Sequence, residues 1–149
     1  MQEKNQKTLK DSVTLTGVGL HNGKNVNLHI KPAEVNHGIK FKRTDLDTNN
    51  IIEANYKNVK PSSLCTKIEN SHGISVSTIE HLMAAFYGEG IDNALVEIDA
   101  PEIPIMDGSA VDFVDAIRSA GVNEQSEPRK FIKVLKKVEI KDGAKFISI

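Results

Sequence analysis

The residues best suited to chemistry are Glu80 and His81, within the run Ser77–Leu82. A histidine can hold a metal ion, and a neighbouring carboxylate can take the proton of a metal-activated water. A catalytic zinc normally needs three protein ligands, and no His-Glu-x-x-His pattern supplies a second one on the same helix. These residues therefore offer half of an active site, supported by the distinctive run 103–110.

Each candidate also has a simpler structural role. A glutamate in the first turn of a helix is favoured by the helix dipole and by capping, which would account for Glu80. A single histidine near a helix start, such as His81, is more often a hydrogen-bonded surface or core residue. His21 lies in a glycine-rich turn, as a binding residue or as an exposed turn residue. Cys65 follows Leu64 in an apolar context, which favours a small buried packing residue.

Strands and two helices must position these residues. Alternating apolar and polar residues predict strands at 13–18, 26–31, 39–41 and 93–98, with shorter extended pieces at 51–54, 64–68 and 74–76. Asn22-Gly23 predicts a hairpin turn between the first two strands. Ser77 or Thr78 can cap the first helix, which we expect to end at Gly88 or Gly90.

The second helix and the carboxyl-terminal segment follow. Ser109 can cap the second helix, and Gly121 ends it. The polar residues 123–128 read as a linker, after which alternation at 132–140 and Asp142-Gly143 predict strands and a hairpin turn. Because the chain ends inside an apolar strand, we expect it to be truncated.

Composition narrows the class of protein. The 149 residues suffice for one domain and part of another, and a net charge of −1 argues against general nucleic-acid binding. A single cysteine rules out an intramolecular disulfide and favours a reducing compartment. No apolar run approaches the roughly 20 residues that span a bilayer, so we expect a soluble, cytoplasmic protein.

The sequence resembles the amino-terminal part of the UDP-3-O-acyl-N-acetylglucosamine deacetylases, which are zinc hydrolases of lipid A biosynthesis. The resemblance covers nearly the whole chain and rests on several strings in the right order. These are Thr8–Lys10, Thr16–Lys24, Arg43–Leu46, Leu64–Thr66, Ser77–Leu82, Gly90–Asn93 and Ala100–Ala110.

The resemblance implies an α+β fold of two related domains, each layering a mostly antiparallel sheet against a helix pair, with the active site between them. Residues 1–126 would form the first domain, and residues 127–149 would be the truncated start of a second, similar domain. A small extra sheet is expected around residues 44–70.

The resemblance also implies the chemistry. His81 would be one ligand of the Zn²⁺ cofactor and Glu80 the general base that removes the N-acetyl group of UDP-3-O-(3-hydroxyacyl)-N-acetylglucosamine. In the family, certain segments border the substrate cleft, and the residues that match them here are Leu20, His21, Leu64 and Cys65. The other metal ligands and the general acid would lie downstream, so we expect this chain alone to be inactive.

Two alternatives stay open. The chain could be a free-standing, non-catalytic domain that acts as a binding or regulatory module, or a separate chain could supply the second half. In the enzyme interpretation the protein works in the cytoplasm of a Gram-negative bacterium, at the membrane surface where its acylated substrate resides.

Overall fold

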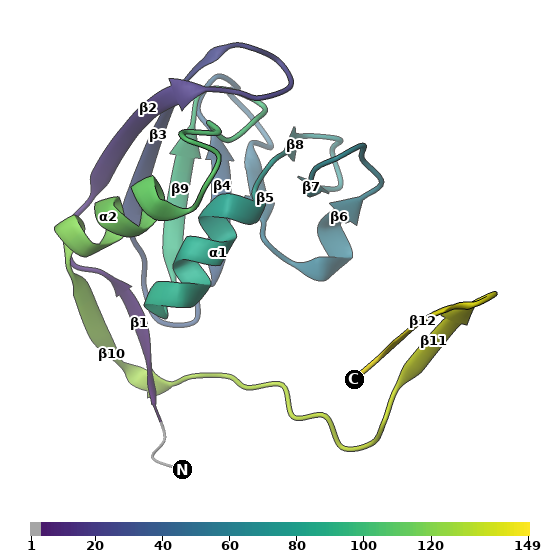
Figure 1. The fold of residues 1–149 in the computed structure, drawn as a ribbon. Coiled ribbons are helices and arrows are strands. Elements are labelled where there is room, and N and C mark those ends of the chain that lie inside the picture. Colours follow the sequence, from purple (N-terminus) through teal and green to yellow (C-terminus); the bar gives the residue numbers. More distant parts are fainter. Residues whose placement is uncertain (1–3) are drawn as a thin grey trace.

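The computed structural model describes residues 4–149, and its centre is a five-stranded sheet covered on one face by two helices (Figure 1). The strand order is β2 (Val13–Val18), β3 (Asn25–Pro32), β9 (Ala94–Ile98), β4 (Ile39–Arg43) and β5 (Ile51–Glu53). Only β4 and β9 run parallel within this sheet; its other pairs are antiparallel. The expected α+β sandwich is confirmed.

The helices α1 (Glu80–Glu89) and α2 (Val111–Ala120) bury one face of the sheet. Their apolar side chains meet those of the sheet in a single core, in which Leu28, Phe41, Leu82, Phe86, Phe113 and Ile117 are fully buried. Gly90 ends α1 in the left-handed conformation (φ 73°), as expected of a glycine after the last turn. Neither helix, nor any other in residues 4–149, is long and apolar enough to cross a membrane.

A small three-stranded sheet extends from the edge of the sandwich. It contains β6 (Val59–Lys60), β7 (Lys67–Glu69) and β8 (Ser75–Val76), and the short 3-10 helix η1 (Tyr56–Asn58) precedes it. Ile68 and Val76 point into the common core and attach this sheet to the main one. The expected extra sheet is thus present, and it extends to Val76.

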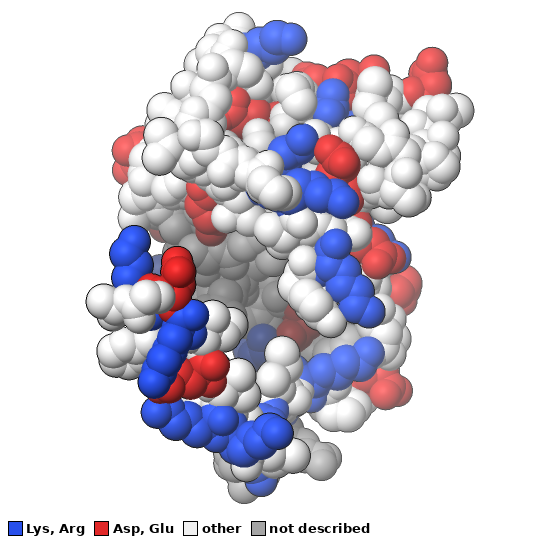
Figure 2. Space-filling model, turned by 90° about the vertical axis from the view of Figure 1, so that its right-hand side faces the viewer, with Lys and Arg blue, Asp and Glu red and all other residues white. Residues whose placement is uncertain are grey.

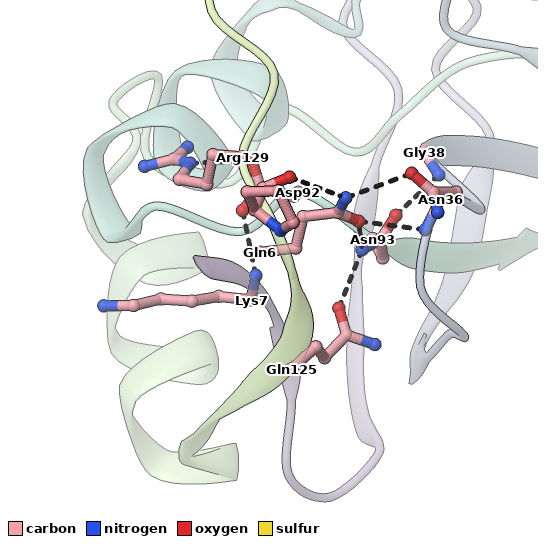
Figure 3. Close-up of polar contacts among 9 residues, drawn as sticks. Gln6, Lys7, Asn36, Gly38, Asp92, Asn93, Gln125 and Arg129 are labelled. Carbon is pink, nitrogen blue, oxygen red and sulfur yellow. Dashed lines mark hydrogen bonds and ion pairs between the residues drawn. The ribbon is translucent and has the colours of Figure 1, made fainter. Parts of the chain in front are cut away.

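Residues 123–128 are not the linker that their polar composition suggested. They belong to β10 (Val122–Pro128), which pairs antiparallel with β1 (Asn5–Leu9), a strand that the apolar pattern did not predict. These two strands lack the usual alternation of apolar and polar residues because polar side chains hold them in place. The buried Asn93 donates to Gln6 Oε1 (2.8 Å) and to Gln125 Oε1 (2.7 Å), as Figure 3 shows.

The same polar cluster continues toward the end of β10. Asn93 Oδ1 accepts from the Gly38 N–H at 2.7 Å, and Asp92 accepts from the Lys7 N–H and from Arg129 Nε, both at 2.9 Å (Figure 3). Every polar group of the Asn93 side chain is therefore used, which suits its 1% exposure. The cluster fixes where the chain leaves the sandwich.

Residues 129–138 form no regular element, so the strand expected from Ile132 onward is absent up to residue 138. A hairpin follows, with β11 (Glu139–Asp142) paired to β12 (Lys145–Ser148) around the expected Asp142-Gly143 turn. Figure 1 draws this hairpin apart from the sandwich. On the face that Figure 2 shows, basic and acidic side chains are interspersed.

Candidate active site

The Glu80-His81 pair lies in the first turn of α1, as the sequence predicted. The expected cap is wrong, however, because Ile79 occupies the N-cap position and no side chain caps the helix. The Thr78 hydroxyl instead donates to Glu102 Oε1 at 3.1 Å. The Thr78 hydroxyl therefore bonds a carboxylate 24 residues away in the sequence and does not cap α1.

Glu80 is half-buried, and its Oε2 accepts a hydrogen bond from the Thr66 N–H at 3.0 Å. Within residues 4–149 no other donor bonds this carboxylate, so its Oε1 can still accept a proton. His81 is also half-buried. The pair therefore combines a fixed carboxylate with an imidazole that solvent can reach.

The Leu64–Cys65 segment leads directly to Thr66, the residue that bonds Glu80. Leu64 is 91% exposed and has a left-handed backbone (φ 58°). Cys65 is half-buried instead of fully buried, and its carbonyl accepts from the Ser62 hydroxyl. An exposed apolar side chain thus stands two residues from the contact to Glu80.

The Leu20–His21 turn is held by the same carboxylate that bonds Thr78. Glu102 accepts from the His21 N–H (2.9 Å) and from the Asn22 N–H (3.0 Å), while the side chains of Leu20 and His21 remain exposed. Glu102 itself is 2% exposed. Reasoning from the sequence missed its role, because nothing in its spacing connects it to contacts 24 and about 80 residues away.

The expected capping of α2 by Ser109 is wrong, because Ala110 occupies the N-cap position and no side chain caps the helix. Ser109 lies one residue before that position, where its hydroxyl accepts from the Val111 N–H at 3.1 Å. Asp107 Oδ1 accepts from both the hydroxyl and the N–H of Ser109, and these bonds lower the pKa of the Asp107 carboxyl. Asp107 thus stabilises this loop.

The donors present fit part of a zinc site. A catalytic zinc takes three protein ligands from histidine, cysteine and carboxylate side chains. No group of three such residues that could hold a metal exists within residues 4–149. His81 supplies one imidazole of suitable chemistry, with the Glu80 carboxylate beside it in the sequence, and the remaining ligands would have to come from elsewhere.

Comparison with known proteins identifies the family. Residues 6–149 match the family described as UDP-3-O-acyl N-acetylglycosamine deacetylase. The UDP-3-O-acyl-N-acetylglucosamine deacetylases of Actinobacillus succinogenes and Shewanella halifaxensis are 50% and 51% identical to the chain over 144 residues. These matches cover 97% of this chain and 47% of each relative, so the chain spans about half the length of the curated relatives it matches. The chain belongs to the UDP-3-O-acyl N-acetylglycosamine deacetylase family.

Proposed function

We propose that the chain is the amino-terminal portion of a zinc-dependent deacetylase, which hydrolyses the N-acetyl group of UDP-3-O-(3-hydroxyacyl)-N-acetylglucosamine in lipid A biosynthesis. The observation that carries this proposal is the Glu80-His81 pair in the first turn of α1, with Glu80 held by the Thr66 N–H. The names of the curated relatives support the choice of substrate.

In this proposal His81 is one zinc ligand and Glu80 is the general base. A bound zinc would lower the pKa of a water ligand and polarise the acetamide carbonyl. Glu80 would accept a proton from the attacking water at Oε1, while the Thr66 N–H holds Oε2 in place. The water oxygen would bond to the acetamide carbonyl carbon, and the C–N bond would then break as the amine nitrogen takes up a proton, giving acetate and the free amine.

The turn at Leu20 and His21 and the segment at Leu64 and Cys65 would border the substrate. Leu20 is 57% exposed and Leu64 is 91% exposed, which suits contact with an apolar part of a ligand. The remaining metal ligands and the general acid would come from a second domain, in the same chain or in a separate one. Residues 1–126 would be the first domain and residues 127–149 the start of the second.

The enzyme would work in the cytoplasm, at the membrane surface that holds its acylated substrate. Neither nucleic acid nor a membrane-spanning segment has a part in this proposal.

The test is a chimera that joins residues 1–149 to the carboxyl-terminal half of the Shewanella halifaxensis relative. We expect zinc-dependent acetate release from UDP-3-O-acyl-N-acetylglucosamine, and none from the 149-residue chain alone. Glu80→Gln should lower kcat by about 10²- to 10⁴-fold, the usual contribution of a general base. His81→Ala should lower both kcat and the zinc content.

His72→Ala is the matched control, because His72 is exposed in the turn between β7 and β8. It should leave both readouts unchanged. Full activity of a folded His81→Ala chimera would refute the proposed ligand. A folded chimera that binds the substrate without releasing acetate would support the non-catalytic binding module instead.

A further inference from the structure

Glu102 is a buried carboxylate bonded by three neutral donors from two separate segments. Its Oε1 accepts from the His21 N–H and the Thr78 hydroxyl, and its Oε2 accepts from the Asn22 N–H. The residue is 2% exposed. A charge this deeply buried is costly unless hydrogen bonds compensate it, and bonds to a charged acceptor are among the stronger ones.

Thr78 has a backbone conformation that needs such support. Its φ is 57°, in the left-handed region that β-branched residues rarely occupy. A conformation of this kind costs about 1–3 kcal/mol and persists only where surrounding contacts impose it. Thr78 lies two residues before Glu80, so its conformation sets the direction in which α1 begins.

The segment around Glu102 supplies the contacts that impose this conformation. The Ser77 N–H donates to the Pro101 carbonyl at 3.0 Å, and the Ile103 N–H donates to the Ser77 carbonyl at 3.1 Å. The hydroxyl of Thr78 then adds its bond to Glu102. Backbone pairing thus fixes the residue before Thr78, and Glu102 fixes Thr78 itself.

We propose that Glu102 is a positioning residue of the deacetylase. It holds Thr78 in the left-handed conformation and thereby places Glu80 and His81, while its other bonds hold the Leu20–His21 turn against the same site. This inference rests on the proposed function, because it assigns Glu80 and His81 the roles given there. Glu102 acts through Thr78 and the turn, without contact to the reacting atoms.

Two variants of Thr78 separate positioning from simple stability. Thr78→Val keeps the shape of the side chain but removes the donor to Glu102, and Thr78→Ser keeps the donor. In the chimera, Thr78→Val should lower kcat by about 10- to 100-fold with little change in KM, since small misplacements of catalytic groups cost that much. Thr78→Ser should restore kcat to near the unmodified value.

Glu102→Gln extends the test to the turn. The amide keeps one acceptor oxygen and puts an NH₂ group where the second oxygen accepted, so at least one bond to the turn is lost and KM should rise. The double variant Thr78→Val/Glu102→Ala should have the kcat of Glu102→Ala alone, because Glu102→Ala removes every bond of the carboxylate, including the one from Thr78. Equal kcat for Thr78→Val and Thr78→Ser, or additive effects in the double variant, would overturn the proposal.

A readout without activity separates this proposal from the proposed function. In the 149-residue chain, Glu102→Gln should speed amide hydrogen exchange at His21 or Asn22 by at least about tenfold, the effect of losing one protecting hydrogen bond. The amide of Val96, in the centre of β9, should be unaffected. Unchanged exchange at both turn amides would refute the role of Glu102, whereas an inactive chimera with the expected exchange would refute only the deacetylase function.

Discussion

A methyl group on the Cα of Gly19 would lie only 2.7 Å from Oε2 of Glu102. It would also lie 2.5 Å from Oδ1 of Asn22. Both distances are shorter than real contacts of a Cβ atom, so a neighbour would have to move. The Leu20–His21 turn can rest on the Glu102 carboxylate only because residue 19 has no side chain.

Gly19→Ala should therefore destabilise the protein. We expect the free energy of unfolding to fall by about 1–3 kcal/mol, as for other insertions of a methyl group into a packed site. Urea denaturation followed by circular dichroism measures this. Gly88→Ala is the control, since an added Cβ at this position of α1 would meet no atom within 4 Å apart from its chain neighbours and the backbone of its own helix. It should raise stability by about 0.5–1 kcal/mol, the helix preference for alanine over glycine. Equal stability of the two variants would contradict the packing argument.

Asn93→Ala should be among the most destabilising single changes in the polar cluster of Figure 3. It removes the donor to Gln6 and Gln125 and the acceptor of the Gly38 N–H. Buried polar groups that lose their partners cost about 1–3 kcal/mol each, so we expect a loss of about 2–4 kcal/mol.

Urea denaturation also measures the effect of Asn93→Ala, with Asn123→Ala as control. Asn123 has the same side chain and lies in β10, but it is exposed. Its replacement should change the free energy of unfolding by less than about 0.5 kcal/mol, as at ordinary surface positions. If both variants were equally stable, the cluster would not be what attaches β10.

The main sheet and both helices could be predicted from the sequence because each buries one apolar face. The alternation in β3 and the glycine after α1 are local signals, and local signals suffice for such elements. The strands β1 and β10 could not be found in this way. Their attachment depends on Gln6, Asn93 and Gln125, which are brought together only by the completed fold.

The same distinction applies to the site. The position of Glu80 and His81 in the first turn of α1 follows from residues nearby in the sequence. The Thr66 N–H that holds Glu80 and the carboxylate that holds Thr78 come from segments 14 and 24 residues away. Threonine commonly caps helices, and Thr78 is close enough to α1 to do so. Its hydroxyl instead donates to the buried Glu102 carboxylate, which is a stronger acceptor than the groups near the start of the helix.

Glu97 should make stability depend on pH in the acid range. Its carboxylate lies on the sheet face opposite the helices, 2.7 Å from Lys31 Nζ and 3.2 Å from Lys42 Nζ. The bond from Lys31, followed by that from Lys42, lowers the pKa of Glu97 below its ordinary 4.5. Because the folded-state pKa is below the unfolded one, the stabilisation is full above about pH 4.5 and is lost as pH falls through the folded value.

Glu97→Gln should therefore lower the free energy of unfolding by about 1 kcal/mol at pH 7, a typical value for a partly exposed charge cluster. The difference from the unmodified protein should vanish in strong acid. Glu53→Gln is the control, because the side chain of Glu53 is 58% exposed and, among residues 4–149, forms an ion pair with Lys40 alone. Denaturation curves between pH 2 and pH 7 measure both variants, and a difference independent of pH would refute the electrostatic origin of the effect.

The hairpin β11–β12 should make the 149-residue chain self-associate. Ile140 and Ile147 are cross-strand partners and are 67% and 71% exposed. Within residues 4–149 each strand of this hairpin pairs only with the other, so both outer edges present free backbone groups. Exposed apolar strands with open edges are sites at which another chain can add.

Sedimentation should accordingly give an average mass that rises with protein concentration. The double variant Ile140→Lys/Ile147→Lys should remain monomeric, since charges on an exposed strand oppose edge-to-edge pairing. Tyr56→Lys, which removes from η1 an aromatic side chain that is 81% exposed, should associate like the unmodified chain. If Tyr56→Lys were as monomeric as the double variant, the chains would associate through the sandwich. If the unmodified chain stayed monomeric at every concentration, the prediction that the hairpin pairs with another chain would be wrong.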